Sequence, residues 1–390
     1  MKPGDDIYRD KYDFTILVLQ GGGALGAYQA GVFEGLAEAG FTPDWIAGVS
    51  IGAVNAALIA GNPPELRVER LREFWNLVTS GLAADPLPEE SRLADPLRRW
   101  VNGVSAAACA TFGVPGFYTP RVTPALLAPA GSAEALSVYD TGALASTLEK
   151  LVDFRRIDTG PIRLSLGAVD VETGNSTYFD SLETPISPRH VMASGALPPA
   201  FAPVEIDGRH YWDGGIVSNS PLWYVLDNAP AMRALVVQVD LFSATGRLPR
   251  DLDGVMERRK DIMYSSKTRF NTTRVRELQR LRGSLHRLLG KIPADLRADP
   301  DVKALERMSR CTHVDIMHLI NRRDAASASS KDYEFSRAGM HRRWSAGLED
   351  VRRSVAHPEW LRRSQLAEGI RVYDLAREGR LDRNFERAHA

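Results

Sequence analysis

Alternating apolar and polar stretches predict strands and helices along the first part of the chain. Residues 14–19 are apolar or β-branched throughout, which is typical of a buried strand in a parallel sheet. Residues 27–39 carry apolar side chains at helical spacing, and 45–47 form a second apolar run. The order strand, helix, strand predicts a right-handed crossover between two parallel strands.

The same patterns predict further elements downstream. Strands are expected over 162–169, with 176–179 as its hairpin partner, over 204–212 with an Asp-Gly turn, over 234–239 and, as the last, over 314–319. Helices are expected within 61–80 and over 192–199, where prolines end the second one. The segment 81–135 is rich in Ala, Pro and Gly and is predicted to be irregular. Its apolar stretch 112–118 fits either a functional cover or a flap packed on the core.

The character of the chain changes from Leu252 onward, where Arg and Glu become frequent. Apolar residues repeat at helical spacing and predict long amphipathic helices: Leu278, Leu281, Leu285 and Leu288. Residues 251–290 contain ten Lys or Arg and five Asp or Glu. A basic helix face of this kind fits contact with phospholipid headgroups, although a solvated face is the preferred interpretation.

These elements predict an α/β fold with a mostly parallel central sheet and helices on both faces. The change of character divides the chain into a first domain over 12–240 and a mainly helical C-terminal extension over 241–390, which contains the strand expected at 314–319.

Composition limits the classes of protein that remain. Of 390 residues, 44% are hydrophobic and 25% charged, which suits a globular chain with a sizeable core. The 49 basic and 49 acidic residues cancel, so no overall field recruits nucleic acid. The two cysteines, Cys109 and Cys311, suggest no disulfide framework, and neither a metal nor a cofactor is expected. The polar N-terminus and the lack of an apolar stretch of about 20 residues favour a cytoplasmic location, with peripheral membrane contact left open.

A candidate nucleophile stands in Gly48-Val49-Ser50-Ile51-Gly52. The pattern lies between the apolar run 45–47 and the Ala-rich, helix-compatible stretch 51–60. A Gly-x-Ser-x-Gly sequence in that context is typical of a nucleophile elbow, a tight turn that raises the serine Oγ above the sheet. Gly48 and Gly52 permit the turn because a Cβ at either position would crowd its neighbours. An ordinary strand–turn–helix connection is the alternative.

The glycine-rich loop that follows the first strand has two functional interpretations. Gly21, Gly23 and Gly26 fit a dinucleotide-binding fingerprint, but that fingerprint needs an acidic residue at the end of the second strand. Asp44 instead precedes that strand, so this interpretation fails. The other interpretation is an oxyanion hole, in which bare backbone N–H groups converge on a developing negative charge. A plain turn would explain one or two of the glycines.

The base that would activate Ser50 is the next candidate. The order Ser50, Asp213, His313 matches a triad of the α/β-hydrolase type, but His313 and His318 lie in a strand-like run. Asp213 ends a predicted strand, and Gly214-Gly215 lets a ligand approach closely. A buried carboxylate has a raised pKa and can act as the base directly. An Asx-turn is the structural alternative for Asp213.

Taken together, the three motifs resemble the patatin-like phospholipase family over about residues 12–240. The resemblance implies the three-layer patatin-like fold and lipid acyl hydrolase activity through an acyl-enzyme. It implies a Ser–Asp dyad of Ser50 and Asp213, with an oxyanion hole in the loop formed by Gly21, Gly22, Gly23, Ala24, Leu25 and Gly26.

Two features qualify the resemblance. Leu25 replaces the Lys or Arg of many members, which removes a cation from beside the site, and the C-terminal extension is similar to that of a bacterial subset. The rival hypothesis from another class is a patatin-like scaffold that binds or assembles with little turnover. The substrate's headgroup and chain length and the oligomeric state are not predicted.

Overall fold

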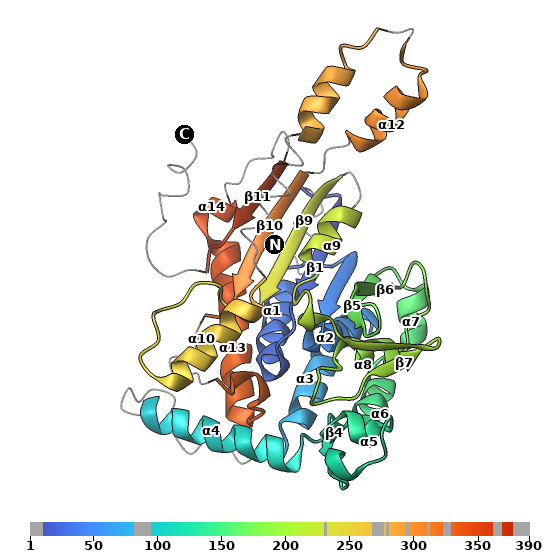
Figure 1. Ribbon diagram of the computed structural model, residues 1–390. Helices are drawn as coiled ribbons and strands as arrows, with labels where there is room; N and C mark the ends of the chain where they lie inside the picture. Colours follow the sequence, from blue (N-terminus) through green and yellow to red (C-terminus); the bar gives the residue numbers. More distant parts are fainter. Residues whose placement is uncertain are drawn as a thin grey trace.

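A central sheet organises the computed structural model of the chain. The structure describes residues 11–81, 95–229, 232–266, 277, 281–293, 296–309, 313–322, 329–361 and 369–376. The strands lie in the order β11 (Gly369–Tyr373), β10 (His313–Ile320), β9 (Arg233–Asp240), β1 (Phe14–Leu19), β2 (Trp45–Val49), β5 (Arg163–Asp170), β8 (Arg209–Asp213) and β7 (Val204–Ile206) (Figure 1). A further strand, β6 (Ser176–Asp180), pairs with β5 outside this sequence of neighbours.

The pairing is parallel from β11 to β5 and antiparallel beyond. β5 pairs antiparallel with both β6 and β8, and β7 with β8 form a hairpin whose turn is Asp207-Gly208. The predicted mostly parallel sheet, the 176–179 partner strand and the Asp-Gly turn are therefore confirmed. Because parallel strands share a direction, the carboxyl ends of β1, β2, β9 and β10 meet at one edge of the sheet.

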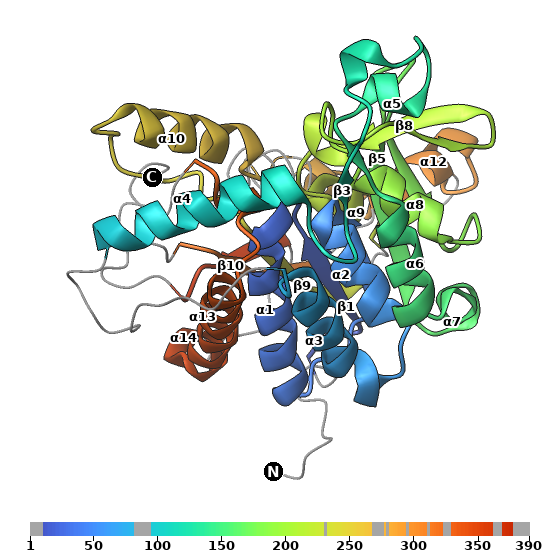
Figure 2. The ribbon, with the colours of Figure 1, turned by 90° about the horizontal axis from the view of Figure 1, so that it is seen from below.

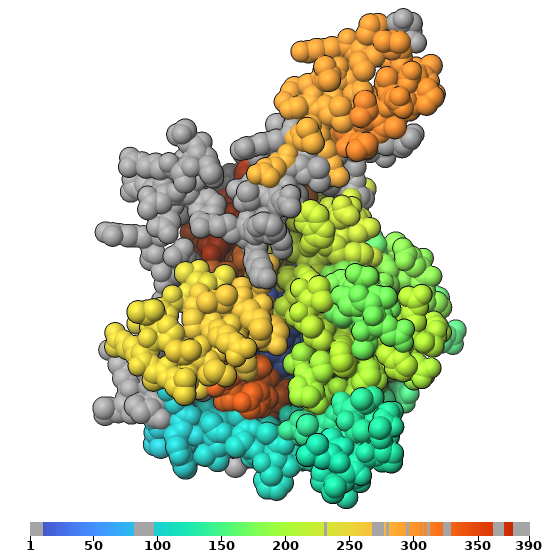
Figure 3. All heavy atoms as spheres, in the orientation of Figure 1, coloured from blue at the N-terminus to red at the C-terminus, as the bar shows by residue number. Residues whose placement is uncertain are grey.

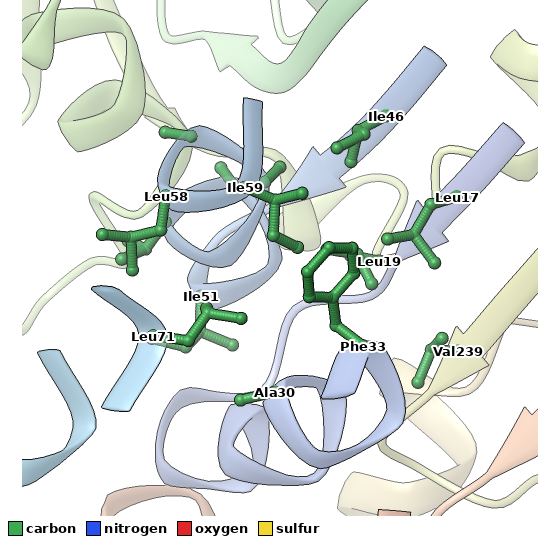
Figure 4. Packing of buried hydrophobic residues seen from close by; sticks show 14 of the residues in the cluster. Leu17, Leu19, Ala30, Phe33, Ile46, Ile51, Leu58, Ile59, Leu71 and Val239 are labelled. Atoms are coloured by element: carbon green, nitrogen blue, oxygen red, sulfur yellow. The ribbon is translucent and has the colours of Figure 1, made fainter. Parts of the chain in front are cut away.

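Helices cover both faces of the sheet, as the alternation of side chains requires. Leu17 and Leu19 of β1 pack in the larger core, under α1 (Ala27–Glu38), α2 (Ile51–Ala60), α3 (Arg67–Val78) and α13 (Arg337–Ala356). Figure 4 shows this packing, with Phe33 of α1 and Ile59 of α2 turned toward the strands. Ile16 and Val18 point to the opposite face and pack with residues of α9 (Leu222–Asn228).

The other described elements are shorter or lie farther from the middle of the sheet. They are η1 (Gly23–Gly26), η2 (Pro64–Leu66), α4 (Asp95–Phe112), β3 (Thr119–Pro120), η4 (Ala125–Leu127), α5 (Ala133–Leu136), β4 (Tyr139–Asp140), α6 (Gly142–Leu151), α7 (Phe154–Thr159), α8 (Pro188–Ser194), η5 (Gly214–Ile216), α10 (Leu252–Tyr264), α12 (Pro300–Met308), η7 (Lys331–Tyr333) and α14 (Pro358–Leu361). In the described part of the chain, no helix combines the length and hydropathy required to cross a bilayer.

The prediction that 81–135 is irregular is wrong for α4, which is 18 residues long. Alanine, which occupies 106–108, has the highest helix propensity of any residue type. No proline interrupts 97–112, so the segment is helical despite its loop-like composition. The stretch 112–118 matches the flap interpretation, because the Phe117 ring packs at 5.9 Å from Phe335 and 6.2 Å from Phe201.

Two other elements differ from expectation. The short helix α8 ends at Ser194, before Pro198 and Pro199, because Gly195 already stops it. Strand β11 lies beyond 314–319, the segment that the sequence predicts as the last strand. It was not predicted because Arg371 interrupts its short apolar pattern. Leu278 lies outside the described residues, while Leu281 and Leu288 lie in a helical stretch, 281–289, and are exposed.

The C-terminal part of the chain packs directly on the N-terminal part. A Cβ on Gly31 of α1 would lie 1.9 Å from the Trp344 backbone oxygen, and one on Gly347 of α13 would lie 2.2 Å from the Tyr28 oxygen. The Tyr28 hydroxyl also donates to Asp350 at 2.8 Å. Glycines on both helices thus bring the two backbones together. The division at residue 240 stays a prediction, and the sheet itself continues across it into β10 and β11.

Candidate active site

Ser50 stands at the carboxyl end of β2, where the chain turns into α2. Its backbone has φ 57° and ψ −126°, one of two positive-φ non-glycine residues among those described. This conformation costs about 1–3 kcal/mol and persists only where the surroundings impose it. The backbone N–H donates to the Ser194 carbonyl oxygen at 3.1 Å and to Ser194 Oγ at 3.0 Å. Ser194, a residue distant in the sequence, therefore stabilises the strained turn.

The glycines on either side of Ser50 leave no room for a side chain. A Cβ on Gly48 would lie 2.4 Å from the Gly52 backbone oxygen, and a Cβ on Gly52 would lie 2.4 Å from the oxygen of Leu19. Strand β1, strand β2 and the first turn of α2 are thus in backbone contact. Ser50 is the N-cap residue of the ten-residue helix α2, so the positive end of the helix faces the serine.

Asp213 ends β8 and is 2% exposed. Burial raises the pKa of its carboxyl from about 3.8 to about 6, because a charged carboxylate loses its hydration there. Hydrogen bonding from the Ser50 side chain and from the Gly215 N–H opposes this shift and lowers the pKa. The Gly215 nitrogen lies 2.7 Å from Asp213 Oδ1. The carboxyl therefore interacts with the Ser50 side chain, and it also makes the Asx-type turn that is the structural alternative for Asp213.

The glycine loop approaches Ser50 through Gly21, whose Cβ, if present, would lie 2.9 Å from Ser50 Cβ. Two N–H groups of the loop are already used. Gly21 donates to the Asn219 backbone oxygen at 3.2 Å, and Leu25 donates to the Gly22 oxygen at 3.1 Å. Within the described residues, no hydrogen bond engages the N–H of Gly22 or Gly23. These two groups, the second at the first residue of η1, are the remaining candidates for oxyanion donors, and Ala24, Leu25 and Gly26 of that turn are buried.

Figure 3 shows a hollow between the atoms of α10 and those of the segments around β7 and β8, with N-terminal residues at its floor. The carboxyl ends of β1, β2 and β9 reach this side of the molecule (Figure 1). In open α/β sheets, ligands bind outside the carboxyl ends of the strands. The residues singled out from the sequence therefore meet where such a fold places a ligand.

The alternatives from the sequence are placed elsewhere. Asp44 lies at the amino end of β2 and accepts hydrogen bonds from the Thr15 N–H (2.7 Å) and hydroxyl (2.9 Å), so it cannot reach a dinucleotide at the opposite edge. His313 begins β10, also at the amino edge. His318 Nε2 is paired with Asp240 Oδ2 at 2.7 Å, not with Asp213.

Comparison with known families then decides the identity of the chain. Residues 17–226, more than half of the sequence, match the family described as patatin-like phospholipase. The chain belongs to the patatin-like phospholipase family. A second family, described as patatin phospholipase, matches residues 262–367. No curated protein matches the sequence. At family level, membership assigns the chain to the lipid acyl hydrolases.

Solved patatin-like proteins share low sequence identity with it. VipD from Legionella pneumophila is 15% identical, with 87% of this chain and 67% of that chain covered and a TM-score of 0.34. The ExoU–SpcU complex from the type III secretion system of Pseudomonas aeruginosa is 17% identical, with 75% of this chain and 59% of that chain covered and a TM-score of 0.25. The type III effector ExoU is 16% identical, with 75% of this chain and 61% of that chain covered and a TM-score of 0.23. The chain thus spans about three-fifths of the two ExoU chains.

Leu25 stands in the glycine loop where the resemblance would suggest Lys or Arg, as in many members of the family. Leu25 is 2% exposed and packs in the core. Arg343 of α13 donates to the Ala24 carbonyl oxygen at 3.5 Å and to Glu334 Oε2 at 2.9 Å. A guanidinium therefore lies behind the loop of this patatin-like chain. Because Glu334 balances the charge of Arg343, this side chain contributes structural contacts to the loop and little net electrostatic field.

Two side chains near the patatin motifs were missed by the sequence reasoning. Ser194 is fully buried, accepts the Ser50 N–H and donates to the Gly167 oxygen at 2.6 Å. Asn219 donates to the Gly21 oxygen at 3.1 Å and to the Tyr264 oxygen at 2.8 Å, which ties the glycine loop to α10. Asn219 lies within the block after Asp213-Gly214-Gly215, so its position was a usable signal, whereas Ser194 had none. Among the described residues, no group of three or more His, Cys, Asp or Glu side chains is arranged to hold a metal ion.

Proposed function

We propose that the chain is a serine acyl-ester hydrolase of lipids that works through a Ser50–Asp213 dyad and an acyl-enzyme. The observation that carries the proposal is the position of a fully buried carboxyl beside a serine held in a strained elbow. Family membership supports the lipid substrate. Gly22 and Gly23 follow β1, Ser50 follows the neighbouring strand β2, and Asp213 ends β8 on the other side of β5, and these positions support their roles.

In the first step, Asp213 accepts the proton of the Ser50 hydroxyl while Oγ attacks the ester carbonyl carbon. A carboxyl with a pKa of about 6 is ionised at neutral pH yet more basic than an ordinary aspartate. The carbonyl oxygen becomes negative in the tetrahedral intermediate. The N–H groups of Gly22 and Gly23 and the positive end of α2 stabilise that charge.

In the second step, the C–O bond of the leaving alcohol breaks, and the alcohol takes the proton from Asp213. The acyl group stays on Ser50 Oγ. Water then attacks the acyl-enzyme, with Asp213 again accepting the proton, and the fatty acid leaves as Ser50 recovers its hydrogen. Every proton that Asp213 accepts is returned within one turnover.

The decisive experiment is labelling of the purified protein with a fluorophosphonate probe, because only an activated serine reacts. Wild type should be labelled at Ser50, and Ser50→Ala should not. Asp213→Asn should be labelled far more slowly. Absence of labelling in a folded wild-type protein would support the binding scaffold instead. Hydrolysis of a panel of phospholipids and neutral lipids then identifies headgroup, chain length and position.

A further inference from the structure

Helix α10 is attached to the protein by its polar face. Lys260 Nζ contacts Asp332 Oδ1 at 2.7 Å, and Lys331 Nζ contacts Glu257 Oε1 at 3.1 Å and Asp261 Oδ1 at 2.7 Å. None of its thirteen residues is buried. A helix on the surface of a soluble protein ordinarily does the reverse, with apolar residues inward and charges outward.

The apolar residues of α10 point to solvent. With a helical rotation of about 100° per residue, five of them share one stripe on the side opposite Glu257 and Asp261. Their exposed fractions lie between 47% and 77%: Leu252, Val255, Met256, Ile262 and Met263. Arg259 is exposed within the same stripe. The helix therefore presents an apolar surface with a cation in it.

Helix α4 also turns polar side chains toward the protein and apolar ones outward, although the buried Ala106 and Cys109 share its inward face. Ser105 donates to Glu334 Oε1 at 2.9 Å, and Asn102 accepts from Arg342 at 3.4 Å, so small polar side chains face the protein. On the opposite side, Leu97, Trp100 and Val104 are 49%, 66% and 51% exposed. Their spacing of three and four residues places them on one face.

The two helices adjoin each other and the candidate active site. Both contact the 3-10 turn η7, α4 by direct packing and α10 through its ion pairs. The same turn packs against η1 of the glycine loop. Figures 1 and 2 show α4 and α10 side by side below the sheet. We call the outward apolar residues of these helices the α4–α10 face.

We propose that the α4–α10 face docks on a lipid surface and so brings the active site to its substrate. This inference rests on the proposed function, because a lipid hydrolase must meet aggregated substrate. Amphipathic helices that lie in a membrane interface combine apolar residues, Trp and Arg, as Leu97, Trp100 and Arg259 do here. A fluid lipid surface can adapt to two convex helices, whereas a protein partner would need a surface of complementary shape.

The contacts also specify how this docking differs from a charge-driven one. Arg258 donates to the Ser243 carbonyl oxygen and Lys260 is paired with Asp332, so these two cations of α10 face the protein. Binding should therefore depend mainly on buried apolar area and only weakly on salt. The basic composition of 251–290, taken alone, would predict strong salt dependence.

Flotation with phosphatidylcholine vesicles that contain a minority of phosphatidylglycerol tests the proposal. The Ser50→Ala background keeps the vesicles intact and separates docking from catalysis. Val255→Glu with Ile262→Glu alters α10, and Trp100→Glu alters α4. Leu182→Glu is the matched control, since Leu182 is 72% exposed and follows β6 at the opposite edge of the sheet. We expect each α4 or α10 variant to lower vesicle partitioning about tenfold or more and the control to bind normally.

Activity on a dispersed short-chain aryl ester and fluorophosphonate labelling should be unchanged in these variants when Ser50 is restored. Vesicle binding that survives all the substitutions would overturn the proposal. A wild type that does not bind vesicles but sediments as a dimer, with monomeric variants, would assign the face to a second copy and also overturn it. Failure of labelling in wild type would instead reject the proposed function and leave the vesicle result intact.

Discussion

The backbone oxygen of Asp332 lies 2.1 Å from the position that a Cβ of Gly23 would occupy. A residue of the C-terminal region thus packs directly on the loop that supplies the candidate oxyanion donors. Gly23 also has φ +53°, a conformation that side chains with a Cβ rarely adopt. The geometry of the loop therefore depends on two conditions at once, a backbone angle and an absent side chain.

We expect Gly23→Ala to lower both kcat and the melting temperature, because the added methyl group collides with backbone that cannot move aside. Gly174→Ala is the matched control: Gly174 has φ +69° and open space around its Cβ position, so it reports backbone strain alone, about 1 kcal/mol. Kinetics and thermal unfolding of both variants check this. Equal destabilisation by the two would show that contact with Asp332 is unimportant.

Two substitutions at Ser50 separate strain from chemistry. Ser50→Ala and Ser50→Gly should both lose ester hydrolysis, since neither has a hydroxyl. Only glycine relaxes at φ 57°, so Ser50→Gly should have the higher free energy of unfolding, by about 1 kcal/mol. Chemical denaturation of the two variants measures the difference. Substantial hydrolysis by either folded variant would contradict the assignment of the nucleophile.

The raised pKa of Asp213 predicts an acid limb in the activity profile. Since the base must be ionised, kcat/KM should rise with pH through about 6 and then level off. A histidine would give a similar limb, so the profile needs the variant beside it. Asp213→Asn should reduce kcat by orders of magnitude at every pH, and an Asn variant that keeps most activity would exclude Asp213 as the base.

The same carboxyl affects stability, with a sign that follows from burial. Because the folded-state pKa is raised from about 3.8 to about 6, the folded protein favours the protonated form and loses stability as pH rises across this window. Asp213→Asn removes that cost. Its free energy of unfolding relative to wild type should therefore grow from about pH 3 to about pH 7, by roughly 3 kcal/mol in total. A pH-independent difference measured by denaturation would contradict the burial argument.

His318 should be a structural residue. It is 7% exposed and paired with Asp240, which Ser266 also contacts, on the far side of β1 from Ser50. His318→Gln should lower stability by about 1–3 kcal/mol and leave most hydrolysis intact, because it disturbs a buried hydrogen bond without touching the dyad. His313→Gln, at the other end of β10, is the control. An inactive His318→Gln that melts normally would instead favour a triad with histidine.

The contact between α1 and α13 predicts that the chain cannot be divided at residue 240. A fragment that ends there lacks α13, β10 and β11, so β9 becomes an open edge and the face of α1 around Gly31 is uncovered. We expect this fragment to aggregate or to lack a cooperative melting transition. A fragment that melts cooperatively and hydrolyses aryl esters would show that the predicted first domain is autonomous.

Local sequence determined the elements that carry the chemistry. The apolar runs at 14–19 and 45–47, the glycines after them and the helical spacing beyond depend on residues only a few positions apart. That is why the turn at Ser50 and the hairpin that precedes Asp213 could be placed in advance. Composition was less informative where it conflicted with propensity, and the Ala-rich α4 was mistaken for a loop.

Tertiary structure decided which of these residues meet and what surrounds them. The contact of Asp332 with Gly23 and the support of Ser50 by Ser194 join positions far apart in the chain, so no local pattern could contain them. The pKa of Asp213 depends on burial by other segments. The orientation of α10 is the clearest case. Its sequence shows an amphipathic helix but not which face the protein covers, and the ion pairs of Lys260 and Lys331 turn its apolar face outward.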